Sequence, residues 1–169
     1  PLTIIKEQKT SNTYLKESIN VLRAVAKSPY VVGSDFIGEE INDISELQPA
    51  IDQIVKYVRE EDPDFTIRIH AGENDSLRNN VRKSILCVKQ ALAEGQEMPR
   101  CRLGHGLYSE DLNSEAGKKL MELMRETGIV VEFQLTSNVR LNNLSDLANH
   151  PIKKFLQNGV KCVQGTDGC

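Results

Sequence analysis

FTIRIHAGE, residues 65–73, is the stretch that decides the fold. Residues 65–70 are mostly aromatic or β-branched, which is typical of a buried β-strand. His70 and Glu73 stand at the end of this strand, so ionisable side chains follow it directly. The same arrangement, a strand that ends in ionisable residues, recurs along the chain.

Strand-like and helix-period segments alternate throughout the sequence. The expected strands cover 30–36, 65–70, 101–105, 129–133 and 160–164. The expected helical faces cover 12–27, 51–58, 81–92, 120–124 and 152–156. Such alternation implies right-handed βαβ units and a parallel sheet.

The spacing of these units favours a barrel. The expected strands begin about 32 residues apart, and eight such units make roughly 260 residues, the usual size of a (β/α)8 barrel. We therefore expect an α/β fold, an incomplete TIM-type barrel of about five βα units. A doubly wound open sheet of five strands is the alternative, although no G-x-G-x-x-G follows a strand to support its dinucleotide-binding version.

Composition places the chain among ordinary soluble globular proteins. It has 169 residues and a formal net charge of −3, with 39% hydrophobic and 27% charged residues. This balance excludes a disordered or fibrous chain, and it argues against nucleic acid or an anionic membrane as the main partner. No apolar run approaches the ~20 residues of a membrane span.

The cysteines indicate a reducing compartment. Cys87, Cys101, Cys162 and Cys169 form no C-x-x-C pair, which argues against a structural zinc knuckle. The N-terminal segment has no apolar core or cleavage site of a signal peptide. We therefore expect reduced thiols and a cytoplasmic protein.

Ionisable residues gather at the expected strand ends. Those after the second, third and fifth strands are His70, Glu73, His105 and Asp167, and Asp35 and Glu39 surround the end of the first. In a parallel barrel all of these ends lie on one face, where the active site sits. Imidazole and carboxylate ligands suit a divalent ion such as zinc, so the pattern predicts a metal-dependent hydrolytic site.

Each of these residues also has a structural explanation. His70 and His105 could be hydrogen-bonded structural histidines, and Asp167 could be a turn residue. Glu73 could cap the following helix, whose N-terminus favours a negative charge. His150 precedes a proline at an expected helix start, and we assign it a structural role there.

Five motifs then follow one another in order. They are VVGSDFIGEE at 31–40, HAGE at 70–73, RLGHG at 102–106, VE followed by TSN at 131–138, and HPI with a later GV and TD at 150–167. Together they resemble the motifs of the adenosine/AMP deaminase family of zinc-dependent aminohydrolases. The resemblance implies removal of the 6-amino group of adenosine or a related purine nucleoside, giving inosine and ammonia.

The resemblance also implies a role for each matching residue. His70 and Asp167 would be zinc ligands, and the metal-bound hydroxide would attack C6 of the purine. Glu73 would shuttle the proton to a purine ring nitrogen, and His105 would orient the hydroxide. The backbone of Gly38 would contact the purine ring. This chemistry is sensible because C6 is a poor electrophile until a ring nitrogen is protonated.

Three departures from the family pattern shape the expectation for this chain. Gly168 replaces the family's second Asp, and FQL at 133–135 stands where C-P is usual. The H-x-H zinc pair of the family's first strand is missing. The five strands would then be strands four to eight of a parent barrel, which makes residues 1–169 a single partial domain, its C-terminal portion.

This partial barrel carries further expectations. A chain that starts at Pro1 without an initiator Met is not expected to begin at the natural start of its gene product. The zinc site would be incomplete and the isolated chain inactive, because a catalytic zinc takes about three protein ligands. Open sheet edges would allow dimerisation. The alternative is a non-catalytic homologue that binds a nucleoside or a protein partner, and a relative acting on a different purine also stays open.

Overall fold

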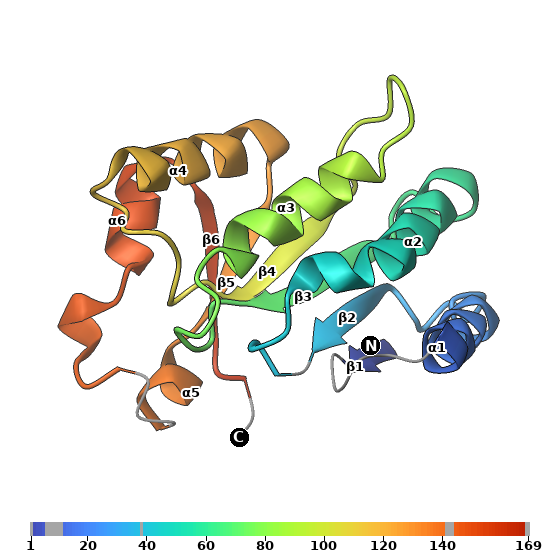
Figure 1. Cartoon of the computed structure of the whole chain (residues 1–169), viewed down its shortest axis with the longest axis horizontal. Coiled ribbons are helices and arrows are strands. Elements are labelled where there is room, and N and C mark those ends of the chain that lie inside the picture. The colour runs from blue at the N-terminus through green and yellow to red at the C-terminus, as the bar shows by residue number, and fades with distance from the viewer. Residues whose placement is uncertain (1, 6–11, 38, 141–143, 168–169) are drawn as a thin grey trace.

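The computed structural model describes residues 2–5, 12–37, 39–140 and 144–167. Its centre is one parallel sheet in which the strands lie side by side in chain order (Figure 1). The strands are β1 (Leu2–Ile5), β2 (Gly33–Ile37), β3 (Thr66–Ala71), β4 (Cys101–His105), β5 (Val130–Gln134) and β6 (Lys161–Gly165). Sequential order without a reversal is that of a barrel segment, because a doubly wound sheet reverses its order at a switch point.

Helices connect the strands, and all of them except the short α5 pack on one face of the sheet, whereas α5 lies near its carboxyl edge (Figure 1). They are α1 (Asn12–Val25), α2 (Gln48–Glu60), α3 (Asn80–Gln90), α4 (Glu115–Thr127), α5 (Leu135–Arg140) and α6 (Ile152–Gln157). Short 3-10 turns at Ile44–Leu47 and Leu147–Asn149 precede α2 and α6. Among the helices of the described residues, none has the length and apolar character that a membrane-spanning helix needs.

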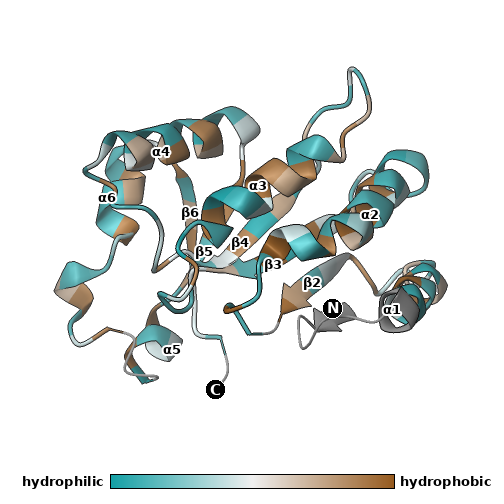
Figure 2. Ribbon diagram, in the orientation of Figure 1, coloured by the Kyte–Doolittle hydropathy of each residue, from teal (hydrophilic) through white to brown (hydrophobic). Residues whose placement is uncertain are grey.

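The two faces of the sheet differ in chemistry because successive side chains of a strand point to opposite sides. The helix-facing strand residues belong to the apolar core, and they include Phe36, Ile67, Ile69, Leu103, Val131 and Phe133. Figure 2 shows apolar residues, in brown, along both the helices and the strands of this layer. The opposite face carries charge: the register sets Asp35 beside Arg68, and Arg68 beside Arg102.

Local sequence signals fix the helix ends. Pro49 lies in the first turn of α2, where its missing N–H leaves no bond unmade. The Ser114 side chain caps α4 by accepting from the backbone N–H of Gly117. Gly128 ends the same helix in the left-handed conformation, with φ of 65°. These signals lie between the strands, so they set where the chain turns back toward the sheet.

All five expected strands are present, and the structure adds two elements. Strand β1 pairs with β2. If β2–β6 correspond to strands four to eight of the expected parent barrel, β1 corresponds to its strand three. Its four residues are too few to show a periodicity. Helix α5 follows β5 directly and contains Thr136, Ser137 and Asn138, residue types that favour turns and caps over helix interiors.

We predict that the core face carries the stability of the sheet. Ile67→Ala should lower the free energy of unfolding by about 2–5 kcal/mol, because Ile67 is fully buried between β3 and the helices. Leu86→Ala is the control, since Leu86 on α3 is 45% exposed and should change stability by only about 0.5 kcal/mol. Urea denaturation checks both variants, and equal losses would contradict the assigned faces.

Candidate metal and proton-transfer site

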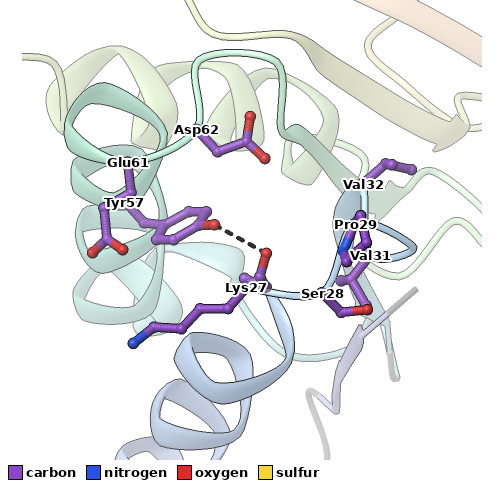
Figure 3. A pocket seen from close by; sticks show the side chains of 9 residues that line it. Lys27, Ser28, Pro29, Val31, Val32, Tyr57, Glu61 and Asp62 are labelled. Atoms are coloured by element: carbon purple, nitrogen blue, oxygen red, sulfur yellow. Dashed lines mark hydrogen bonds between the residues drawn. The ribbon is translucent and has the colours of Figure 1, made fainter.

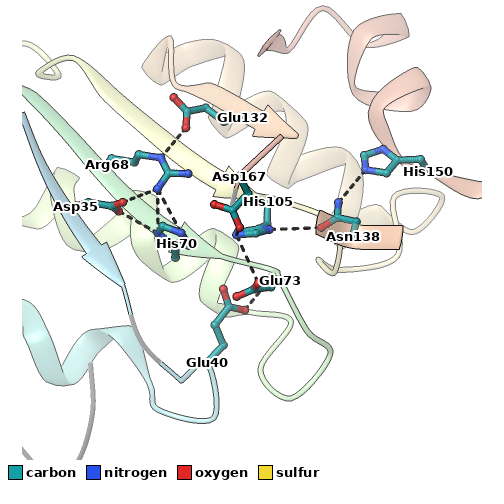
Figure 4. A network of polar contacts seen from close by, with 10 residues as sticks. All are labelled: Asp35, Glu40, Arg68, His70, Glu73, His105, Glu132, Asn138, His150 and Asp167. Atoms are coloured by element: carbon teal, nitrogen blue, oxygen red, sulfur yellow. Dashed lines mark hydrogen bonds and ion pairs between the residues drawn. The ribbon is translucent and has the colours of Figure 1, made fainter. Parts of the chain in front are cut away.

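Polar side chains from three strand ends converge at the carboxyl edge of the sheet (Figure 4). Nε2 of His105 lies 3.8 Å from Oε1 of Glu73 and 3.9 Å from Oδ2 of Asp167. The rings of His70 and His105 have centroids 5.1 Å apart. These four residues come from β3, β4 and β6 or directly follow them, so the parallel sheet itself brings them together.

Two of these residues have an unusual backbone conformation. His105 has a φ of 73° and Asp167 a φ of 64°, the only positive values at non-glycine positions in the described ranges. Residues other than glycine rarely adopt this left-handed backbone region, and such backbone strain concentrates at functional sites. His105 is the last residue of β4 and Asp167 lies two residues after the end of β6, so in both cases the chain leaves the strand there and the side chain lies in the cluster.

A buried carboxylate fixes the turn that carries Glu73. Oε2 of Glu40 accepts the backbone N–H groups of Gly72 and Glu73, at 2.8 and 3.0 Å. Gly72 has a φ of 84°, and a Cβ there would lie 2.7 Å from the carbonyl oxygen of Tyr108. Only glycine fits this turn, so Glu40 and Gly72 together position Glu73.

His70 is oriented by a network of charges on the open face of the sheet. Nδ1 of His70 lies 2.9 Å from Oδ1 of Asp35, and Arg68 forms ion pairs with both Asp35 and Glu132. The proton of His70 therefore lies on Nδ1, and its Nε2 bears the lone pair, 3.3 Å from Nη1 of Arg68. A carboxylate behind a histidine in this way is typical of metal-binding histidines.

The same network keeps its carboxylates ionised. Burial raises the pKa of Asp35, but the hydrogen bond from His70 and the charge and hydrogen bond of Arg68 outweigh it, so the pKa is lowered. Burial likewise acts to raise the pKa of Glu132, but Arg102 and Arg68 overcome it, and this pKa is also lowered. Asp35 thus carries the negative charge that holds His70 in one orientation.

His105 is held from behind by a second chain of polar groups. One end of the Asn138 amide lies 3.4 Å from Nδ1 of His105, and the other end lies 3.1 Å from Nε2 of His150. All three residues are buried. Burial lowers the pKa of His105 and lowers that of His150 to about 4. Both rings are therefore neutral at neutral pH.

The donor set fits a zinc ion. Ligand atoms of His70, His105 and Asp167 all lie within 4.8 Å of one another. Nε2 of His105 is buried and has no hydrogen-bond partner among the described residues. Zinc binds imidazole nitrogen and carboxylate oxygen, usually with four ligands in total. The described residues thus supply a partial zinc site with buried supporting groups.

Four of the expected site residues meet in the structure. His70, Glu73, His105 and Asp167 lie together, whereas Gly38 and Gly168 lie outside the described residues. Asp35 joins the site as the partner of His70, and the side chain of Glu39 is exposed. His150 has the expected structural role, because its Nδ1 accepts the backbone N–H of Ile152 at the start of α6.

Three residues support the site in ways that the sequence pattern did not predict. Glu40 stands in the quoted 31–40 motif, and Arg68 stands two residues before His70 in a strand otherwise rich in apolar residues. A charged residue inside a buried strand was the available signal for Arg68. Asn138 lies in the TSN motif, but no sequence signal shows that it joins His105 to His150.

Two hollows lie away from this cluster. One of about 380 Å³ lies at the amino end of β2 and β3, where Tyr57 donates to the backbone oxygen of Ala26 (Figure 3). The other, of about 500 Å³, lies on the open face beside Asp35, Arg68 and Glu132. The first hollow lies at the amino ends of the strands, opposite the carboxyl ends that carry the site. The second adjoins the charged residues that support His70.

Comparison with known proteins identifies the relatives of this arrangement. The model of the adenosine deaminase family matches residues 3–169. Adenosine deaminase of Vibrio parahaemolyticus is 29% identical over 143 residues, which cover 85% of this chain and 36% of that protein. Adenosine deaminase of Plasmodium gallinaceum is 35% identical over 140 residues, covering 80% and 32%. The chain thus spans about a third of the length of these curated relatives.

Solved structures confirm the fold. The Arabidopsis N6-mAMP deaminase MAPDA matches with a TM-score of 0.68 and 19% identity, covering 98% of this chain and 41% of that one. The adenine deaminase of Arthrobacter aurescens also matches with a TM-score of 0.68, at 18% identity, covering 98% and 43%. These neighbours are complete deaminase TIM barrels, so the chain folds as part of such a barrel.

We predict that His150 makes stability fall on mild acidification. Its pKa is about 4 in the folded protein against 6.5 for an ordinary histidine, so the unfolded chain binds the extra proton. Stability is therefore complete above about pH 6.5 and falls by about 1–2 kcal/mol between about pH 7 and pH 5. His150→Asn, which keeps an acceptor for α6, should show a shallower fall in urea denaturation at the two pH values. An equal fall in both proteins would contradict a neutral buried His150.

Proposed function

The chain belongs to the adenosine deaminase family, and from that premise we propose that it forms the C-terminal part of a zinc-dependent hydrolase. The reaction removes the 6-amino group of adenosine or a related purine nucleoside and gives inosine and ammonia. One observation carries the proposal: His105 lies within 4 Å of both Glu73 and Asp167. A proton-transfer group and a metal-ligating group thus share one point at the edge of the sheet.

In this proposal His70 and Asp167 hold the zinc. His70 presents Nε2, because Asp35 occupies its Nδ1, and Asp167 presents a carboxylate from the end of β6. When bound, zinc supplies a water molecule of lowered pKa as the nucleophile. The supporting Asp35 raises the basicity of the imidazole and fixes its direction.

Glu73 and His105 carry the proton chemistry. Glu73 delivers a proton to a purine ring nitrogen, which makes C6 electrophilic enough for attack. His105 faces the same space through Nε2 and orients the attacking oxygen. The turn held by Glu40 keeps the Glu73 carboxyl at this point, so the proton is delivered to one place on the ring.

The substrate is proposed from the relatives. Curated relatives are adenosine deaminases, and solved structures of Arabidopsis ADAL contain IMP and GMP. A purine nucleoside or nucleotide therefore suits this site, with the backbone of Gly38 against the purine ring. Neither nucleic acid nor a membrane is a proposed partner, in keeping with the net charge of −3.

The chain forms one partial domain in this proposal. Its sheet has β1 and β6 as edge strands in the described ranges, and pairing of these edges joins two copies into a dimer. Cys87, Cys101 and Cys162 are free thiols, which suits a reducing compartment such as the cytoplasm. Two proposed zinc ligands fall short of the usual three, so the isolated chain is inactive.

An inosine-formation assay tests this function. With zinc and adenosine, the isolated chain should give no turnover. A chimera in which the preceding part of the Vibrio parahaemolyticus relative is joined to Pro1 should deaminate adenosine. Glu73→Gln in the chimera should lower kcat by about 10²–10⁴-fold, because it removes the proton shuttle.

Glu122→Gln is the matched control, since Glu122 is exposed on α4 and its loss should leave kcat unchanged. Turnover by the isolated chain would contradict the proposed incomplete site. A folded chimera that holds zinc but forms no inosine would favour the non-catalytic, nucleoside-binding alternative.

A further inference from the structure

The buried chain His150–Asn138–His105 has a defined direction of hydrogen bonding. The backbone N–H of Ile152 can only donate, and it lies 3.1 Å from Nδ1 of His150. Nδ1 of His150 must therefore accept. A neutral imidazole has one accepting nitrogen and one N–H, so the proton of His150 lies on Nε2.

This proton decides the orientation of Asn138. Nε2 of His150 donates, so the amide end of Asn138 that lies 3.1 Å away must be the carbonyl oxygen. The two ends of an amide have nearly the same shape, and hydrogen-bond chemistry assigns them. A half-turn of the amide relative to Figure 4 meets this requirement and moves no other group.

The orientation of Asn138 then decides the state of His105. The NH2 end of the amide faces Nδ1 of His105 at 3.4 Å, so Nδ1 accepts and the ring proton lies on Nε2. Nε2 is the buried atom that faces Glu73 and Asp167. An Nε2 that bears a proton can donate a hydrogen bond, but it cannot ligate a metal.

We propose that Asn138 and His150 are positioning residues that hold His105 in its Nε2–H form, which makes His105 a hydrogen-bond donor to the reacting oxygen and not a zinc ligand. The inference deepens the proposed function of His105 and rests on it. It also separates His105 from His70, whose Nδ1 proton faces Asp35 and whose Nε2 bears the lone pair. The two histidines of the site thus have opposite tautomers for opposite tasks.

Imidazole nitrogen NMR on the intact chain tests this directly. The chain has only three histidines, and at about pH 8 both buried rings are neutral, so each tautomer can be read from its ¹⁵N shifts. We expect the Nε2–H form for both His105 and His150. The Nδ1–H form of His105 in the wild-type chain would overturn the proposal.

Asn138→Asp tests the amide orientation. The carboxylate that this substitution introduces presents an accepting oxygen to both rings, so the His150 contact is kept while Nδ1 of His105 should gain a proton. If Asn138 already presented its oxygen to His105, the substitution would leave the protonation of Nδ1 unchanged. That result would also overturn the proposal.

A matched pair at position 150 tests whether His150 acts through Asn138. His150→Gln places an NH2 near the former Nε2 and should keep His105 as Nε2–H, although α6 loses its acceptor. His150→Asn keeps an acceptor for Ile152 but does not reach Asn138, so the His105 signals should become those of a tautomer mixture. A tautomer mixture at His105 in His150→Gln but not in His150→Asn, or an unchanged His105 in both variants, would overturn the role of His150.

These NMR measurements do not depend on turnover, so they test the inference even if the deaminase proposal fails.

Discussion

The parallel register of the sheet is the constraint on which the rest of the structure depends. Because β3 and β4 pair with Ala71 opposite His105 and His70 opposite Gly104, both histidines leave the sheet at the same edge. The pairing of β5 with β6 then places Asp167 two residues beyond the paired end of its strand. A shift of one residue in any of these strands would move its side chains to the other face and dismantle the site.

Three of the four candidate functional residues have a buried supporting partner. Asp35 holds His70, Glu40 holds the turn before Glu73, and Asn138 holds His105. These partners come from elements other than the one that carries the supported residue. The fold therefore holds His70, Glu73 and His105 in place through three separate contacts. Proton transfer and metal binding require this kind of preorganisation.

The strand-end pattern was sufficient to predict much of this arrangement. Alternating apolar and helical periods predicted β2–β6, and ionisable residues at their ends predicted that His70, Glu73, His105 and Asp167 would meet. The sequence did not predict β1 and α5, because segments of four and six residues are too short to show a strand or helix periodicity. The partners of the site were missed for a different reason. Hydrogen bonds between residues about 30 positions apart, such as that between Glu40 and Glu73, depend on tertiary placement and leave no local pattern.

Zinc affinity of matched histidine variants tests the division of roles at this site most directly. The measurement is competition with a chromophoric chelator on the intact chain, on His70→Gln and on His105→Gln. The account predicts that His70→Gln weakens binding by about tenfold or more, because it removes a ligand, whereas His105→Gln changes it by less than about threefold. An equal loss in the two variants would show that His105 ligates the metal, and it would contradict the assignment of His70 and Asp167 to the metal and of Glu73 and His105 to the proton chemistry.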